Sequence, residues 1–110
     1  MVIGETRPNE EAIESATLPK KTVLAIYPNP FNPSTELSFS LAKSADVSLV
    51  VYDVRGRQVR VLQQGIMQAG EQKFVWNGRD NQGHATASGV YLARLVVSGA
   101  AQVVRMTLIQ

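Results

Sequence analysis

The sequence predicts an all-β fold, an antiparallel sandwich of about seven short strands. Three observations support this. Apolar and polar residues alternate in one segment after another, turn-forming glycine, asparagine, aspartate and serine separate the segments, and no stretch between them has the period of an amphipathic helix. Two packed sheets bury one face of each such strand, so a sandwich is expected. An open barrel is the structural alternative.

Residues 27–35 are expected to form a rigid, extended lead-in to the first long strand. They contain three of the chain's five prolines, each of which fixes φ near about −65° and makes the preceding residue extended. A helix is therefore excluded here. We expect the rings of Tyr27 and Phe31 to lie against the edge of the core. The apolar residues 22–26, which come before it, are expected to pair at a sheet edge.

The remaining strands follow from the period of two that a half-buried strand shows. Leu37, Phe39 and Leu41 alternate with polar residues, and residues 46–52 are apolar on both faces, which indicates a central strand. A tight turn at Gly56 leads to its hairpin partner. The other expected segments are strands at residues 59–62, 72–76, 90–97 and 101–109, an irregular crossing at 65–70 and a loop at 77–83.

The expected core comes from one face of each strand. Phe74 and Trp76 share a face, and the last strand turns Val104, Met106 and Leu108 inward. On the strand before it, the inward residues are Tyr91, Ala93, Leu95 and Val97. Strands at spacings of roughly 8 to 14 residues are typical of an immunoglobulin-like β-sandwich. The chain has no cysteine, so this sandwich lacks the disulfide found in antibody domains.

The chain is long enough for one domain. Residues 1–21 contain four glutamates, two prolines and few residues to bury, so we expect a linker or disordered arm there. Residues 22–110 are expected to form the immunoglobulin-like domain. No apolar run approaches the roughly 18 residues needed to cross a bilayer, and no membrane span is expected.

Composition argues against catalysis, metal binding and nucleic-acid binding. The net charge is only +2, too weak for the electrostatic footprint of a nucleic-acid-binding protein. His84 is the only histidine, and the carboxylates are spread over separate segments, so no catalytic pair or triad can be assigned. The sequence therefore predicts no enzyme, with no catalytic residue, no metal ligand and no cofactor.

Two local features have competing interpretations. Residues 80–83, Asp-Asn-Gln-Gly, are rich in oxygen and could bind Ca²⁺, but they lack the acidic ladder of a calcium loop. Side-chain bonds to the turn backbone are the favoured interpretation. Arg55, Arg57 and Arg60 are interpreted as a solvated hairpin end, and the alternative is a contact patch for an acidic partner.

A third feature concerns sugar binding. Trp76, Tyr91 and Tyr52 would form a stacking platform for carbohydrate if their rings were exposed and coplanar. Trp76 and Tyr91 lie in register with apolar neighbours, so burial in the core is favoured.

Several motifs occur in an order that resembles a known family. They are the proline-rich residues 27–35, Val-Tyr-Asp-Val-Arg-Gly-Arg at 51–57, Trp-Asn-Gly-Arg-Asp at 76–80, Ser-Gly-Val-Tyr at 88–91 and Arg-Met-Thr-Leu at 105–108. Residues 27–110 thereby resemble the type A C-terminal sorting domain of proteins exported by the type IX secretion system. They are also similar to the Ig-like domain of the flagellar hook-capping protein.

The resemblance implies a non-catalytic module at the end of a larger secreted protein. Its implied partners are the N-terminal passenger domain of the same precursor and the outer-membrane secretion machinery, and its implied location is secreted or at the cell surface. The family's proline motif falls on Pro28, Asn29 and Pro30, its Gly-x-Tyr motif on Gly89 and Tyr91, and its basic position on Arg105. The chain differs from the family in having arginine, where lysine is common, at residue 105, and in ending with Gln110.

Two expectations about recognition follow. The proline-rich lead-in at residues 27–35 is expected to fix how the passenger leaves the module. The last strand and the loop around Gly89 are expected to be read by strand addition, because a terminal strand exposes backbone groups at its edge. The alternative functions are a spacer or stabilising module beside an extracellular enzyme, a part of an appendage, and a carbohydrate-binding module.

Overall fold

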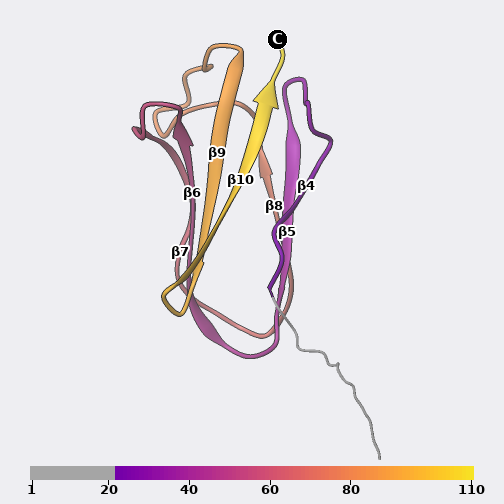
Figure 1. The fold of residues 1–110 in the computed structure, drawn as a ribbon, viewed down its shortest axis with the longest axis vertical. Coiled ribbons are helices and arrows are strands. Elements are labelled where there is room, and N and C mark those ends of the chain that lie inside the picture. Colours follow the sequence, from indigo (N-terminus) through magenta and orange to yellow (C-terminus); the bar gives the residue numbers. More distant parts are fainter. Residues whose placement is uncertain (1–21) are drawn as a thin grey trace, which may run out of the picture.

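The computed structural model describes residues 22–110, and the arm expected at residues 1–21 lies outside these described residues. Seven strands form two sheets that face each other (Figure 1). The larger sheet has the strand order β10-β9-β6-β7, and the smaller has the order β4-β5-β8. The strands are β4 (Ala25–Tyr27), β5 (Thr35–Leu41), β6 (Ala45–Asp53), β7 (Gln58–Met67), β8 (Gly70–Trp76), β9 (Gly89–Val97) and β10 (Ala100–Leu108).

Neighbouring strands within each sheet are antiparallel. The immunoglobulin-like β-sandwich is therefore confirmed. Strand β6 lies between β9 and β7. Its neighbouring residues Leu49 and Val50 are both buried, although consecutive side chains of a strand point to opposite faces. This agrees with the central strand that its two apolar faces predicted.

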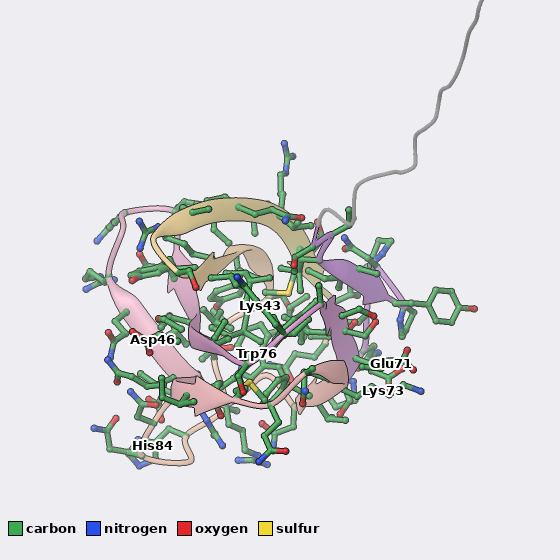
Figure 2. The ribbon with its side chains drawn as sticks, turned by 90° about the horizontal axis from the view of Figure 1, so that it is seen from below. Lys43, Asp46, Glu71, Lys73, Trp76 and His84 are labelled. Carbon is green, nitrogen blue, oxygen red and sulfur yellow. The ribbon has the colours of Figure 1, made fainter. Side chains whose placement is uncertain are left out.

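The core lies between the sheets and contains residues that the period of two placed inward. Trp76, Leu37 and Leu49 are fully buried, as are Met106 and Leu108 of the last strand. Figure 2 shows Trp76 among the side chains between the sheets, with His84, Lys73 and Glu71 at the periphery. No helix in residues 22–110 is long and apolar enough to cross a membrane.

Two segments differ from the sequence-based expectation. The first edge strand is Ala25–Tyr27, later than the expected residues 22–26. Strand β7 continues through Gly65 to Met67, where an irregular crossing was expected. Ile66 in this edge strand is exposed, so the segment lacks the burial pattern from which a strand is predicted. It is a strand because its backbone pairs with β6 up to the pair Ala45–Met67.

Both rings of the proline-rich segment were predicted to lie against the core, and this is correct for Phe31 and wrong for Tyr27. Phe31 is buried in the core with 2% exposure, whereas Tyr27 is 80% exposed. Tyr27 is the last residue of an edge strand in which Ile26 packs against the core. Because neighbouring residues of a strand face opposite ways, Tyr27 points to solvent.

Candidate functional site at the last strand

Strand β10 forms one edge of the larger sheet. It pairs with β9 along its whole length, from Ala100–Val97 to Leu108–Gly89, without a register shift. The C-terminal part of its other side faces the proline-rich segment. Residues 28–30 of that segment carry the proline motif of the family that the sequence resembles. We call residues 28–31, Pro-Asn-Pro-Phe, the proline strap.

The proline strap covers the C-terminal part of the β10 edge. The Phe31 amide donates to the Thr107 carbonyl oxygen at 2.9 Å, and the Ile109 amide donates to the Phe31 carbonyl oxygen at 2.9 Å. These two bonds form a parallel bridge between Phe31 and Leu108. The strap thus occupies the place of a short additional strand in the larger sheet.

Asn29 extends this cover with its side chain. Its Nδ2 donates to the Arg105 carbonyl oxygen at 2.9 Å, and its Oδ1 accepts from the Thr107 amide at 3.0 Å. A primary amide has one acceptor oxygen and a donor nitrogen close together, so it satisfies two backbone groups of a strand edge at once.

The prolines explain why the chain changes sheets at this point. Strand β4 pairs with β5 as far as Tyr27–Glu36. Pro28 and Pro30 have no amide hydrogen and cannot continue a ladder. The Thr35 hydroxyl donates to the Pro28 carbonyl oxygen at 2.6 Å and holds the bend against the start of β5.

The ring of Phe31 anchors the strap in the core. Its centroid lies 5.6 Å from that of Trp76, and Trp76 makes an edge-to-face contact with Tyr91 at 5.2 Å. Trp76 Nε1 donates to the Arg79 carbonyl oxygen at 2.9 Å, and the Tyr91 hydroxyl donates to the Ala87 carbonyl oxygen at 2.6 Å. With Trp76 0% and Tyr91 7% exposed, burial in the core is confirmed and these two rings form no stacking platform.

The structure brings the six residues of the family motifs to one region around β10. Pro28, Asn29 and Pro30 lie in the strap, and Arg105 lies beside it through the Asn29 bond. Across β10, Gly89 pairs with Leu108 and Tyr91 with Met106. Sequence reasoning missed Thr107, which offers both its amide and its carbonyl group to the strap. Thr107 lies in the Arg-Met-Thr-Leu motif at residues 105–108, but its side-chain type predicts no role there, because only its backbone takes part.

Within residues 22–110, the N-terminal part of the β10 edge has no pairing strand. Backbone groups of alternate residues in a strand point the same way, so those of Ala101 and Val103 point to the same side as those of Thr107. In the part of the chain that the structure describes, no bond to these outward groups is recorded. Both residues are exposed. Among residues 22–110 no strand pairs with this side of residues 101–103, which we call the open edge.

Gln102 closes the sandwich beside this open edge. Its Oε1 accepts from the Leu24 amide at 2.8 Å, and its Nε2 donates to the Thr22 carbonyl oxygen at 2.8 Å. The side chain of Gln102 thus links the larger sheet to the segment that enters the smaller one.

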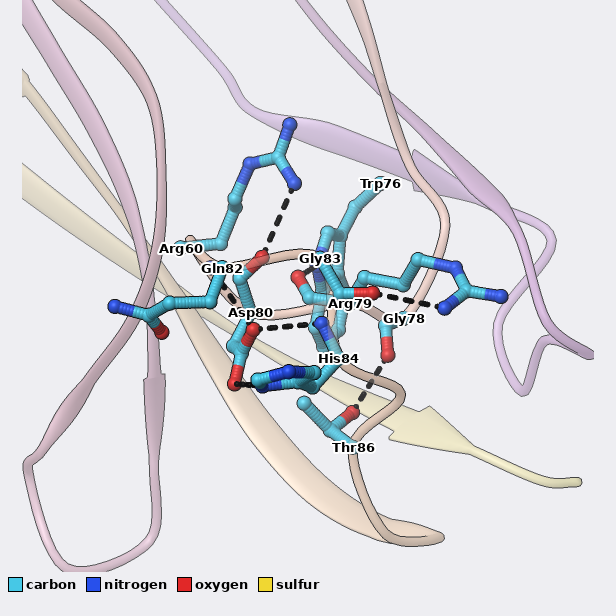
Figure 3. Close-up of polar contacts among 9 residues, drawn as sticks. All are labelled: Arg60, Trp76, Gly78, Arg79, Asp80, Gln82, Gly83, His84 and Thr86. Carbon is cyan, nitrogen blue, oxygen red and sulfur yellow. Dashed lines mark hydrogen bonds and ion pairs between the residues drawn. The ribbon is translucent and has the colours of Figure 1, made fainter.

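The loop at residues 77–84 is held by its own backbone and side chains (Figure 3). Asp80 Oδ1 accepts from the amides of Gln82 at 3.0 Å and His84 at 2.9 Å. The bond from the His84 amide is the main cause that lowers the pKa of Asp80 below its ordinary value. The interpretation of Asp80 as a turn former is confirmed. Residues 22–110 contain no group of three potential metal ligands.

Asn81 protects the opposite edge of the larger sheet as Asn29 protects β10. Its Oδ1 accepts from the Val61 amide at 2.9 Å, and its own amide donates to the Val59 carbonyl oxygen at 3.0 Å. Each edge of the sheet is therefore covered over part of its length by an asparagine side chain together with backbone bonds, from Phe31 at β10 and from Asn81 itself at β7. Such cover is a common protection against edge-to-edge association.

Two of the three arginines near the β6–β7 hairpin, Arg57 and Arg60, have local side-chain partners. Arg57 Nε forms an ion pair with Asp53 Oδ2 at 3.0 Å, and the Arg57 amide is the main cause that lowers the pKa of Asp53. Arg60 Nη1 donates to the Asp80 carbonyl oxygen at 3.3 Å. These contacts support the interpretation of a solvated hairpin end.

Replacing Asn29 with alanine is expected to lower the free energy of unfolding by about 1–2 kcal/mol, because two hydrogen bonds to β10 are lost. Chemical denaturation of the purified chain measures this. Asn32→Ala is the matched control: Asn32 is exposed in the same segment and should change the stability by less than about 0.5 kcal/mol. Equal effects of the two substitutions would show that the Asn29 bonds do not hold the strap.

Comparison with known proteins identifies the domain. The family model described as the FlgD Ig-like domain matches residues 27–101. The chain belongs to the FlgD Ig-like domain family. The match begins at Tyr27, directly before the strap, and includes β5 to β9. No curated protein matches the chain in sequence.

Solved structures share the fold. PorZ of Porphyromonas gingivalis, described as an essential bacterial surface component of the type IX secretion system, is 26% identical over 79% of this chain, with a TM-score of 0.51. Latent PorU of the same organism is 19% identical over 94% of this chain, with a TM-score of 0.65. At that identity the PorU likeness shows the fold alone. The chain spans only 11% of the length of PorZ and 10% of that of PorU.

A further solved structure shares this fold. The alkylpurine DNA glycosylase AlkC of Pseudomonas fluorescens is 18% identical over 79% of this chain, with a TM-score of 0.51. This likeness concerns the fold only, and a shared fold does not establish a shared function.

Proposed function

We propose that residues 22–110 form a non-catalytic C-terminal module that directs the secretion and cell-surface attachment of a larger passenger protein through the type IX secretion system. Residues 1–21 would link the module to its passenger. The machinery at the outer membrane would be its second partner, and the mature location would be secreted or at the cell surface.

One observation carries this proposal. Motif residues at opposite ends of the domain, Asn29 and Arg105, are joined in one structural unit by the strap and the last strand. A receptor that contacts this unit contacts a surface that exists only when the domain has closed. The likeness to PorZ supports the same conclusion, since PorZ is described as a component of that secretion system.

The open edge indicates how a receptor would recognise the module. Strand addition requires backbone groups without partners. Because the strap occupies the edge from Arg105 onward, the part of β10 open to a receptor strand is residues 101–103. The strand addition that we expect at the last strand is therefore confined to its N-terminal part, because the strap contacts occupy the edge from Arg105 onward.

A secretion assay tests the proposal. Residues 22–110 are fused to the C-terminus of a reporter in a host that has this export route, and reporter in the medium or on the cell surface is measured. Deleting residues 101–110 is expected to abolish export. That deletion also removes Met106 and Leu108 from the core, so a variant that keeps the fold is needed as well.

Val103→Pro is that variant. It removes an outward amide at an edge, a position where proline is tolerated in sheets, and Val103→Thr is the control that keeps the amide. We expect Val103→Pro to unfold cooperatively in a thermal melt yet to be exported poorly, while Val103→Thr is exported normally. Export by the deletion variant would refute the proposal. Normal export of folded Val103→Pro would refute recognition by strand addition.

The family match favours a second candidate function. The matching family model is that of the FlgD Ig-like domain. The resemblance to the Ig-like domain of the flagellar hook-capping protein suggests the alternative, a structural module that spaces a neighbouring domain or joins an appendage. The full-length open reading frame separates the two, because a sorting module must be the last domain of its protein. A further domain after residue 110 would favour the structural role.

A further inference from the structure

On the outer face of the larger sheet, apolar and basic side chains form two neighbouring rows that run across the strands. The register places one residue each from β6, β9 and β10 side by side in each row. The first row is Tyr52, Leu92 and Arg105, and the second is Val50, Arg94 and Val103. We call these six residues the basic–apolar patch.

The floor of the patch is apolar. Val50 is only 6% exposed although its side chain lies on the outer face, and Leu92 and Tyr52 are half-buried. A shallow hollow of about 320 Å³ is lined by Tyr52, Gly56, Leu92, Arg94 and Val103. Val103 is 54% exposed, so apolar surface is open to solvent at the rim of this hollow.

The two arginines carry the charge of the patch. Arg94 and Arg105 lie on adjacent strands and are diagonal neighbours, since Arg94 pairs with Val103 and Arg105 with Leu92. Diagonal neighbours in an antiparallel pair are roughly 7–8 Å apart, within reach of long side chains. The ion pairs recorded among residues 22–110 involve Asp53 and Asp80, and neither row contains a carboxylate.

We propose that the basic–apolar patch binds an extended segment of a partner protein in which an aliphatic or aromatic side chain and a carboxylate lie two residues apart, so that both face the patch. The apolar side chain enters the hollow beside Leu92. The carboxylate lies between the guanidinium groups of Arg94 and Arg105, which bind carboxylates through paired N–H donors. Two arginines are too few for the run of phosphate contacts on which nucleic-acid binding depends.

This inference does not depend on a role in secretion, because it concerns binding by the purified chain. If the module is a sorting domain, the patch adjoins the open edge through Val103. Arg105, the basic position of the family motif, would then bind a carboxylate of the receptor. If the module is a spacer, the same patch is the contact with its neighbour.

The test is a titration of the isotope-labelled full chain, followed by amide NMR shifts, at low salt. The probe is a short capped peptide in which a leucine and an aspartate lie two residues apart, with uncharged polar residues at the other positions, and the comparison peptide has asparagine in place of the aspartate. We expect the acidic peptide to bind with a submillimolar Kd and to shift the amides of Leu92, Arg94, Val103 and Arg105. The asparagine peptide should bind at least about tenfold more weakly, a difference of one pKd unit.

Three variants decide the outcome. Arg94→Gln and Arg105→Gln should each weaken binding by about tenfold, as expected when one partner of a charge-assisted contact is removed. Lys73→Gln is the matched control, since Lys73 is an exposed strand residue of the smaller sheet and its loss changes the net charge equally. The proposal is wrong if Lys73→Gln weakens binding as much as the arginine variants. It is equally wrong if no shifts appear at millimolar peptide, or if a mixed-sequence oligonucleotide shifts the same amides more strongly than the peptide.

Discussion

Phe31→Ala is expected to lower the free energy of unfolding by about 3–5 kcal/mol, the usual cost of truncating a buried phenylalanine. Phe31 is 2% exposed and packs against Trp76. Its ring anchors the proline strap, so the substitution also loosens the bonds between the strap and Thr107. Urea denaturation followed by tryptophan fluorescence measures the change.

Tyr27→Ala is the control for this prediction. Tyr27 is also an aromatic residue of the proline-rich segment, but it is 80% exposed, and its replacement should change stability by no more than about 0.5 kcal/mol. If both substitutions cost the same, the ring of Phe31 does not anchor the strap.

Trp76→Ala is expected to have an effect of similar size, about 3–5 kcal/mol. Trp76 is 0% exposed, contacts both Phe31 and Tyr91, and donates to the Arg79 carbonyl oxygen. Its removal leaves a large cavity between the sheets and takes a donor from the loop at residues 77–84. Calorimetry should show a much lower Tm or loss of a cooperative transition.

The same variant distinguishes the carbohydrate-binding alternative. A sugar-stacking tryptophan is exposed, so its loss would abolish binding to insoluble polysaccharide and leave stability unchanged. We expect the reverse: the parent chain does not bind polysaccharide, and Trp76→Ala is strongly destabilised. Val75→Ala is a control on the same strand, because Val75 is 63% exposed. A stable Trp76→Ala variant would contradict the core assignment.

Much of this fold could be predicted because burial leaves a periodic trace in the sequence. Leu37, Phe39 and Leu41 alternate with polar residues and are all buried in β5. The C-terminal half of β7 leaves no such trace, because Ile66 is exposed and the strand depends on backbone pairing. Tyr27 was misplaced for a related reason: an aromatic residue near a core is expected inside, but strand alternation turns it outward.

The candidate site could be predicted only in part. The motifs identified Asn29 and Arg105 as residues of interest, but the hydrogen bond between them joins positions 76 residues apart. Such a bond follows from how the sheets close, which composition and periodicity do not specify. Arg94 was missed for the same reason, since its proximity to Arg105 depends on the β9–β10 register.

Native-state hydrogen exchange tests the central claim, that the strap covers one part of the β10 edge and leaves another part open. The account predicts slow exchange for the amides of Phe31, Thr107 and Ile109, whose acceptors are known, and fast exchange for those of Ala101 and Val103. In Asn29→Ala the Thr107 amide should become fast while the β9–β10 ladder stays protected. Equal protection of Val103 and Thr107 in the parent chain would contradict the account.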